Sequence, residues 1–133
     1  MDFLIDADVI IDFFNGKTEL FDFFQDTENK YVSVLTVGEL NHKVIEYKSA
    51  KPDYDSVINI ANDFCHLLHI INVDERIAVE YGKLKAKYTH NNQQTTIEDS
   101  KLWLCATAII RDMVFVTNDD SVAQVKEVVT KKI

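Results

Sequence analysis

In Phe3-Leu4-Ile5-Asp6-Ala7-Asp8-Val9-Ile10-Ile11, three apolar residues lead directly into an acid, and a second apolar stretch follows. A short apolar run that ends at polar residues is typical of a buried strand. Comparable runs lie at residues 31–35, 69–73 and 114–117, with a weaker one at 128–129, and stretches of helical period separate them. This alternation predicts an α/β protein, in which helices cover a central, mostly parallel sheet of four or five strands.

Apolar residues between the strand candidates recur at helical spacing and predict amphipathic helices. The run from Leu102 to Ile110 is apolar on nearly every side, so we expect the helix that contains it to be central and buried. Five phenylalanines crowd into residues 13–24, and two interpretations stay open for them: ordinary core packing, or contact of part of the group with a partner.

The composition is that of a compact globular domain. The chain has 133 residues, of which 47% are hydrophobic and 27% charged, with three glycines and one proline. At this length folding buries roughly two-thirds of the surface that the unfolded chain exposes. No internal repeat or composition break divides the sequence, so we expect a single domain spanning residues 1–133.

No feature of the sequence predicts export or membrane insertion. Residues 1–6 contain no basic region and reach an acid at Asp2, unlike a signal peptide. No apolar run approaches the ~20 residues that span a bilayer. Cys65 and Cys105 lie in helix-like apolar patterns and are interpreted as buried, reduced thiols. We expect a cytoplasmic protein with no membrane association.

The formal net charge of −8 argues against a broad basic surface for nucleic acid, because phosphate contacts dominate that kind of affinity. Any contact with nucleic acid must then be local. The candidate side chains are those of Lys43 and Lys48 and the row Lys83, Lys85 and Lys87, although such a row is usually a solvated helix face.

Four acids fall near predicted strand ends or helix starts. Asp6 directly follows the first strand, Glu39 lies one helical turn beyond the second, Asp99 stands at the start of the buried helix, and Asp119 follows the fourth strand. Ligands of open α/β sheets bind beyond the carboxyl ends of the strands. We therefore expect these four carboxylates to meet at one edge of the sheet.

Four carboxylates in one place would repel one another unless cations lay among them. Two Mg²⁺ ions, with Mn²⁺ able to substitute, would balance this charge, and both metals prefer oxygen ligands. Such a pair activates water and stabilises the in-line displacement at a phosphodiester. The pattern predicts a nuclease in which Asp6, Glu39, Asp99 and Asp119 bind the metal and carry the catalysis.

Each acid also has a structural interpretation. Thr36 to Glu39 and Thr96 to Asp99 both fit a capping box, in which the carboxylate only satisfies a helix N-terminus. Glu39 could instead pair with Lys43 one turn later. Asp6 could be a simple turn or cap residue, and Asp120 competes with Asp119 as the fourth acid. The coincidence of four acids, rather than any one of them, favours catalysis.

The same residues resemble the motifs of PIN domains, and the resemblance covers almost the whole chain. In order, the four motifs are Phe3 to Ile11, Ser33 to Leu40, Glu98 to Ile109 and Val116 to Asp119. Length and motif order most resemble the VapC-type toxins of toxin–antitoxin pairs. The resemblance implies a three-layer α/β/α sandwich, Mg²⁺-dependent endoribonuclease activity, a small antitoxin as partner, and a homodimer or a toxin–antitoxin hetero-oligomer.

Three positions depart from the family pattern. Val122 stands where the family commonly has Phe, and Lys101 and Trp103 replace smaller or apolar residues in the third motif. We expect these departures to change the substrate groove and to leave the metal site intact.

Two other functions remain open. Residues 4–9 also resemble the first motif of haloacid-dehalogenase-type phosphatases, in which Asp6 would be the nucleophile. The phosphatase interpretation leaves Glu39 and Asp99 without a role. A catalytically silent module that binds only a protein would be expected to lack one or more of the acids.

Overall fold

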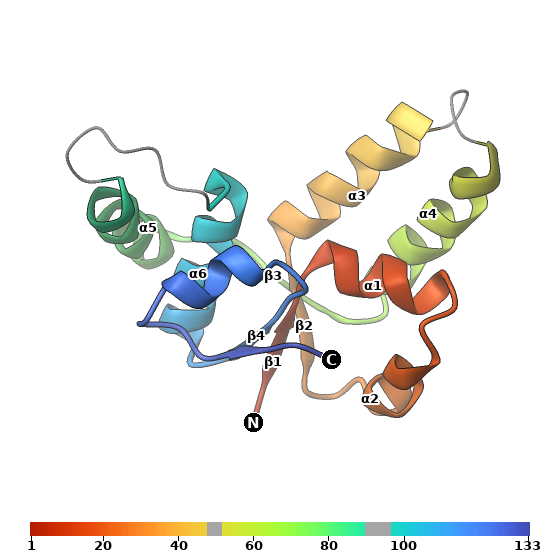
Figure 1. Ribbon diagram of the computed structural model, residues 1–133, viewed down its shortest axis with the longest axis horizontal. Coiled ribbons are helices and arrows are strands. Elements are labelled where there is room, and N and C mark those ends of the chain that lie inside the picture. The colour runs from red at the N-terminus through yellow and green to blue at the C-terminus, as the bar shows by residue number, and fades with distance from the viewer. Residues whose placement is uncertain (48–51, 90–96) are drawn as a thin grey trace.

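The computed structural model describes residues 1–47, 52–89 and 97–133 (Figure 1). The elements in this part of the chain are β1 (Phe3–Ile5), α1 (Ala7–Phe14), η1 (Thr18–Leu20), α2 (Phe21–Gln25), β2 (Lys30–Ser33), α3 (Val34–Tyr47), α4 (Pro52–Cys65), β3 (His69–Ile71), α5 (Glu75–Tyr88), α6 (Asp99–Arg111), β4 (Val114–Val116), η3 (Asp120–Gln124) and β5 (Thr130–Lys131).

The five strands form one sheet in the order β3-β2-β1-β4-β5, and every pairing is parallel. The chain builds β1, β2 and β3 outward in one direction and then adds β4 and β5 on the other side of β1. The crevice beyond the carboxyl ends of β1 and β4 is therefore the topological switch point, where doubly wound sheets bind their ligands.

Helices cover both faces of this sheet, because successive strand residues point to opposite sides. Leu4 and Phe115 face a core that includes buried residues of α5 and α6. Their neighbours Ile5 and Val116 face a second core, formed with α1, α2, α3 and α4. Figure 1 shows the two groups of helices on either side of the strands. The predicted three-layer α/β/α sandwich with a parallel sheet is confirmed.

Of the strands in the described residues, only β1 has the predicted bounds. The third and fourth strands end earlier than predicted, at Ile71 and Val116. The second strand ends at Ser33, whose hydroxyl accepts a hydrogen bond from the Leu35 backbone N–H (3.0 Å) and caps α3. The fifth strand lies at Thr130–Lys131, just beyond the weak apolar pair that predicted it. The polar stretch before α6, with Thr96, and the candidate Lys48 lie outside the described residues.

The phenylalanines of α1 and α2 divide between core and surface. Phe13, Phe14, Phe23 and Phe24 pack in the second core, joined by a ring from α4. Phe21 points outward and is 59% exposed. Core packing is thus the role of most of the group. No helix within the described ranges is long and apolar enough to cross a membrane.

Candidate functional site

Asp6 lies at the switch point and is completely buried. Its backbone N–H donates to the Val116 carbonyl (3.0 Å), which joins the ends of β1 and β4. Its carboxylate caps α1, because Oδ1 accepts from the Ala7 N–H (2.8 Å). The turn from strand to helix therefore holds this carboxylate in one orientation, beyond the carboxyl ends of the two central strands.

The second oxygen of Asp6 has two further donors. Oδ2 accepts from Lys101 Nζ at 2.5 Å and from Thr117 Oγ1 at 2.7 Å. The Lys101 side chain is only 5% exposed and that of Asp6 is 0% exposed. The pair is thus a buried salt bridge, completed by a hydroxyl from the residue that directly follows β4.

Other acids act on the same ammonium. Burial alone would lower the pKa of Lys101, but the charges of Asp6, Asp8 and Glu39 outweigh it and raise the pKa above its usual value. Lys101 therefore stays protonated at neutral pH.

Glu39 lies in the second turn of α3 and is half-buried. Desolvation raises its pKa above the ordinary value, Asp6 and Asp8 add to this shift, and Lys101 and Lys43 oppose it. Glu39 thus belongs electrostatically to the pocket around Asp6.

The capping interpretation of Glu39 is wrong. Thr36 lies inside α3 rather than before it, and its buried hydroxyl has no hydrogen-bond partner among the described residues. Ser33 caps this helix instead.

Asp119 connects to the pocket through Thr117. The Asp119 backbone N–H donates to Thr117 Oγ1 (3.1 Å), and the same hydroxyl donates to Asp6. The Asp119 carboxylate itself accepts from the N–H (2.9 Å) and hydroxyl (2.6 Å) of Ser121 and caps η3. Asp120 points to solvent and pairs with Lys132 (3.0 Å), so Asp119 is the acid of this loop that lies next to the pocket.

Asp99 does not join the other acids. Its carboxylate accepts a hydrogen bond from the Tyr81 hydroxyl (2.5 Å) and pairs with Lys85 (3.0 Å), both on α5. The hydrogen bond from Tyr81 lowers the pKa of Asp99. Residues two apart in an α-helix lie roughly 200° apart around its axis. Because Lys101 faces Asp6, Asp99 must face away from it, and the predicted place of Asp99 in the pocket is wrong.

The three residues that depart from the family pattern were expected to change the substrate groove and to leave the metal site intact, but the structure places them differently. Val122 is fully buried in the core with α5 and α6. Trp103 stacks on Tyr81, with ring centroids 3.9 Å apart and planes 6° from parallel. Lys101, by contrast, enters the predicted metal site itself. No signal in the sequence favoured it over Asp99, because the residues that follow it in α6 are apolar on nearly every side of the helix.

As they stand, these residues do not fit the predicted metal centre. Across the residues that the structure describes, no group of three or more Asp, Glu, His or Cys side chains is arranged to hold a metal ion. Asp6 and Glu39 contribute to one pocket, but an ammonium already lies on Asp6 Oδ2. A cation that belongs to the chain offsets part of the acidic charge of this pocket.

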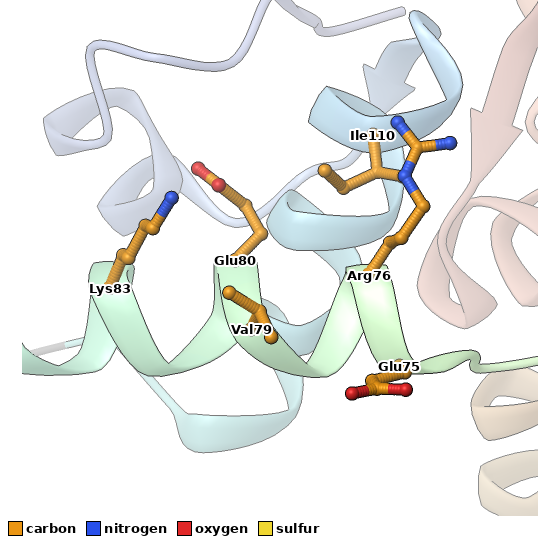
Figure 2. Close-up of a pocket in the computed structure, with 6 residues that line it drawn as sticks. All are labelled: Glu75, Arg76, Val79, Glu80, Lys83 and Ile110. Carbon is orange, nitrogen blue, oxygen red and sulfur yellow. The ribbon is translucent and has the colours of Figure 1, made fainter.

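A separate groove lies along α5 and contains none of the predicted acids (Figure 2). A smaller hollow adjoins the pocket at the carboxyl end of β4, and Thr117, Asp119, Lys131 and Lys132 are among its lining residues. This second hollow is linked to Asp6 through Thr117, which lines the hollow and donates a hydrogen bond to the Asp6 carboxylate.

The parallel sheet and the buried acid at its switch point define the class of protein: a doubly wound α/β domain whose site lies at the carboxyl ends of its central strands. The profile of the PIN domain matches residues 3–128, and the chain belongs to this nuclease family. The resemblance predicted from the four motifs is confirmed. A comparison with curated protein sequences found no match.

Solved structures share the fold over nearly the whole chain. DNA-bound VapBC from Salmonella typhimurium has a TM-score of 0.80 at 18% identity, covering 99% of this chain and 98% of that one. VapBC2 from Rickettsia felis, bound to a promoter DNA fragment, has a TM-score of 0.78 at 18% identity, with the same coverage. FitAcB from Neisseria gonorrhoeae has a TM-score of 0.75 at 20% identity, covering 96% and 95%. The fold is thus that of the VapC-type proteins that the motifs resemble.

Proposed function

We propose that this chain is the toxin of a toxin–antitoxin pair, a single cytoplasmic PIN domain that cleaves RNA at the pocket around Asp6. Membership of the PIN family supports nuclease activity. Several of the similar structures are described as VapBC or toxin–antitoxin complexes, which supports a small antitoxin as the partner. The same family membership leaves the phosphatase alternative without support.

One observation carries the assignment of the site: Asp6 is buried at the carboxyl ends of β1 and β4, where Thr117 contacts it. This is the position at which open α/β sheets bind their ligands. Glu39 and Asp119 are the other acids that we propose for the site. Asp99 is omitted because its carboxylate is directed to α5.

RNA contacts are proposed beside the pocket rather than along α5. In the predicted basic row, Lys85 pairs with Asp99 and Lys87 with Glu127, so two of its charges are already compensated. The hollow next to Thr117 has Lys131 in its wall, together with Lys132, whose charge is paired with Asp120. The Lys131 side chain at that place would attract a phosphate to the pocket in spite of the acidic chain as a whole.

Dependence on Mg²⁺, with Mn²⁺ able to substitute, is proposed under one condition. A divalent cation needs the carboxylate oxygens of Asp6. It can reach Oδ2 only when the Lys101 ammonium leaves it.

The partner surface is supported by apolar side chains on the outer helices. Ile60 and Leu67 are 50% and 73% exposed, and they line an open apolar groove with Phe14 and Phe64. Exposed apolar surface of this kind is typical of protein contacts. A homodimer and a hetero-oligomer with an antitoxin are both compatible with it.

The direct test is cleavage of mixed RNA by the purified chain, with Mg²⁺ or Mn²⁺ and with EDTA. We expect cleavage only at Mg²⁺ or Mn²⁺ concentrations high enough to displace the Lys101 ammonium, and we expect EDTA to abolish it and Glu39→Gln to reduce it strongly. Glu39→Gln is a better test variant than a substitution of Asp6, because it leaves the Asp6–Lys101 salt bridge in place. Equal cleavage by Glu39→Gln and the native chain would contradict the proposed site.

A catalytically silent interaction module is the second candidate. The observation that favours it is the Lys101 ammonium on Asp6. This candidate predicts that the native chain cleaves no RNA at any Mn²⁺ concentration and still binds an antitoxin.

A further inference from the structure

We infer that the Lys101 ammonium and a divalent cation are mutually exclusive occupants of the position beside Asp6, and that the native pocket is held in its ammonium form. The inference concerns the site of the proposed function, and it explains how the access of metal to that site is controlled. It does not require that RNA is the substrate.

The hydrogen bonds of Asp6 leave little room for a metal. An ionised carboxylate offers about four lone-pair positions. Oδ1 uses one of them for the Ala7 N–H, and Oδ2 uses two, for Lys101 Nζ and Thr117 Oγ1. A Mg²⁺ ion binds a carboxylate oxygen at about 2.1 Å. An ion at that distance from Oδ2 would overlap the ammonium, which lies 2.5 Å from the same oxygen.

The one remaining lone pair, on Oδ1, is also unfavourable for a divalent cation. A cation there would lie close to the positive charge of Lys101. The two charges would repel in a region that solvent hardly reaches, because the Lys101 side chain is 5% exposed. The ammonium therefore opposes a divalent cation on either oxygen of Asp6.

The pocket already contains one positive charge of the chain's own. Asp6, Asp8 and Glu39 all interact with the Lys101 charge, which offsets part of their mutual repulsion. A buried acid cluster without a cation would be costly. Here the chain supplies the cation from the third residue of α6, so chelation of metal should not destabilise the fold.

The length of the side chain at position 101 decides which occupant fits. Lysine spans the distance from α6 to Asp6 with its own ammonium. An aspartate at that position is too short to reach Asp6, but an aspartate plus a bound cation fills about the same length. Asp99 cannot supply this carboxylate, since it faces α5. Lys101→Asp should therefore convert the pocket from the ammonium form to a metal-binding form.

The test is titration calorimetry with Mn²⁺ on the native chain and on Lys101→Asp. We expect Mn²⁺ to bind Lys101→Asp about 10- to 100-fold more tightly than the native chain, the range typical of changes around metal ligands. Lys85→Met is the matched control, because it removes a lysine that pairs with an aspartate outside the pocket, and its Mn²⁺ affinity should equal that of the native chain. Adding Glu39→Gln to Lys101→Asp should remove the gain and show that the new site is this pocket.

Equal Mn²⁺ affinity of the native chain and Lys101→Asp would overturn the inference. Should Lys101→Asp fail to fold, the native chain decides by itself: tight, saturable Mn²⁺ binding or a rise in its unfolding temperature with Mn²⁺ overturns the inference, and absence of both supports it. The two proposals fail separately. A gain of Mn²⁺ affinity in Lys101→Asp without RNA cleavage by any variant keeps the inference and refutes the ribonuclease.

Discussion

Lys101 and Asp99 are two residues apart on α6, and their charged groups lie on opposite sides of it. Lys101 Nζ contacts buried Asp6 at the switch point, and the Asp99 carboxylate accepts from the Tyr81 hydroxyl on α5. One helical phase produces both contacts, because residues two apart differ by roughly 200° around the axis. The electrostatics of the pocket follow from this phase: the helix delivers a positive charge to Asp6, and it directs the negative charge of Asp99 to α5.

Asp6→Asn should destabilise the fold by about 3–5 kcal/mol, because it leaves the Lys101 ammonium buried without its anion. Urea denaturation of the variant measures this loss. Asp6→Asn combined with Lys101→Met should recover much of the stability, since no buried charge is then left unpaired in this contact. A double variant that is no more stable than Asp6→Asn would show that the salt bridge is not the cause.

Thr117→Val should cost about 1–3 kcal/mol, the range for leaving buried polar groups without a partner. The Thr117 hydroxyl donates to Asp6 Oδ2 and accepts from the Asp119 N–H, so its removal affects both. Thr117→Ser keeps the hydroxyl and should retain most of the native stability. Chemical denaturation of the two variants separates the effect of the hydroxyl from that of the methyl group. A larger loss in Thr117→Ser than in Thr117→Val would assign the cost to packing of the methyl group.

The fold and the position of Asp6 could be predicted from the sequence, but the phase of α6 could not. A short apolar strand that ends at Asp6, within a parallel sheet, has few other places for this residue. In α6, residues from Leu102 to Ile110 are apolar on nearly every side, so the pattern does not show which side faces the sheet edge. Either Asp99 or Lys101 could then face Asp6. We predicted Asp99 because we expected acids to gather around a metal. The structure instead places Lys101 beside Asp6, where its positive charge compensates the buried carboxylate.

The capping prediction for Glu39 failed for a local reason of the same kind. Thr36 precedes Glu39 at the three-residue spacing of a capping box, and Ser33 lies three residues before Thr36. The strand ends early enough for the Ser33 hydroxyl to bind the Leu35 N–H, so Thr36 falls inside the helix. Which of two hydroxyls three residues apart caps the helix depends on where the strand stops pairing, and Ser33 is the last residue of β2 that pairs with β3.

Asp99→Asn should leave Mn²⁺ binding by the Lys101→Asp variant unchanged, whereas Glu39→Gln should abolish it. Asp99 contacts α5 through Tyr81 and Lys85, and it is half exposed. The stability cost of Asp99→Asn should be at most about 1 kcal/mol, as for other exposed ion pairs. Calorimetric titration of the two variants in the Lys101→Asp background makes the comparison. Loss of Mn²⁺ binding in Asp99→Asn would return Asp99 to the site.

The pH dependence of stability should carry a signature of Glu39. Burial raises its folded pKa above the ordinary value of 4.5, so the folded chain holds this proton more tightly than the unfolded chain. Stability contributed by the protonated form is therefore fully present below the ordinary pKa and is lost as the pH rises through the folded pKa. Glu39→Gln has no proton to lose, so it should be more stable than the native chain at neutral pH, and the difference should shrink as the pH falls to the ordinary pKa. Unfolding midpoints of both proteins across this range test the sign. A native chain that gains stability relative to Glu39→Gln as the pH rises would mean that attraction to Lys101, rather than desolvation, dominates at Glu39.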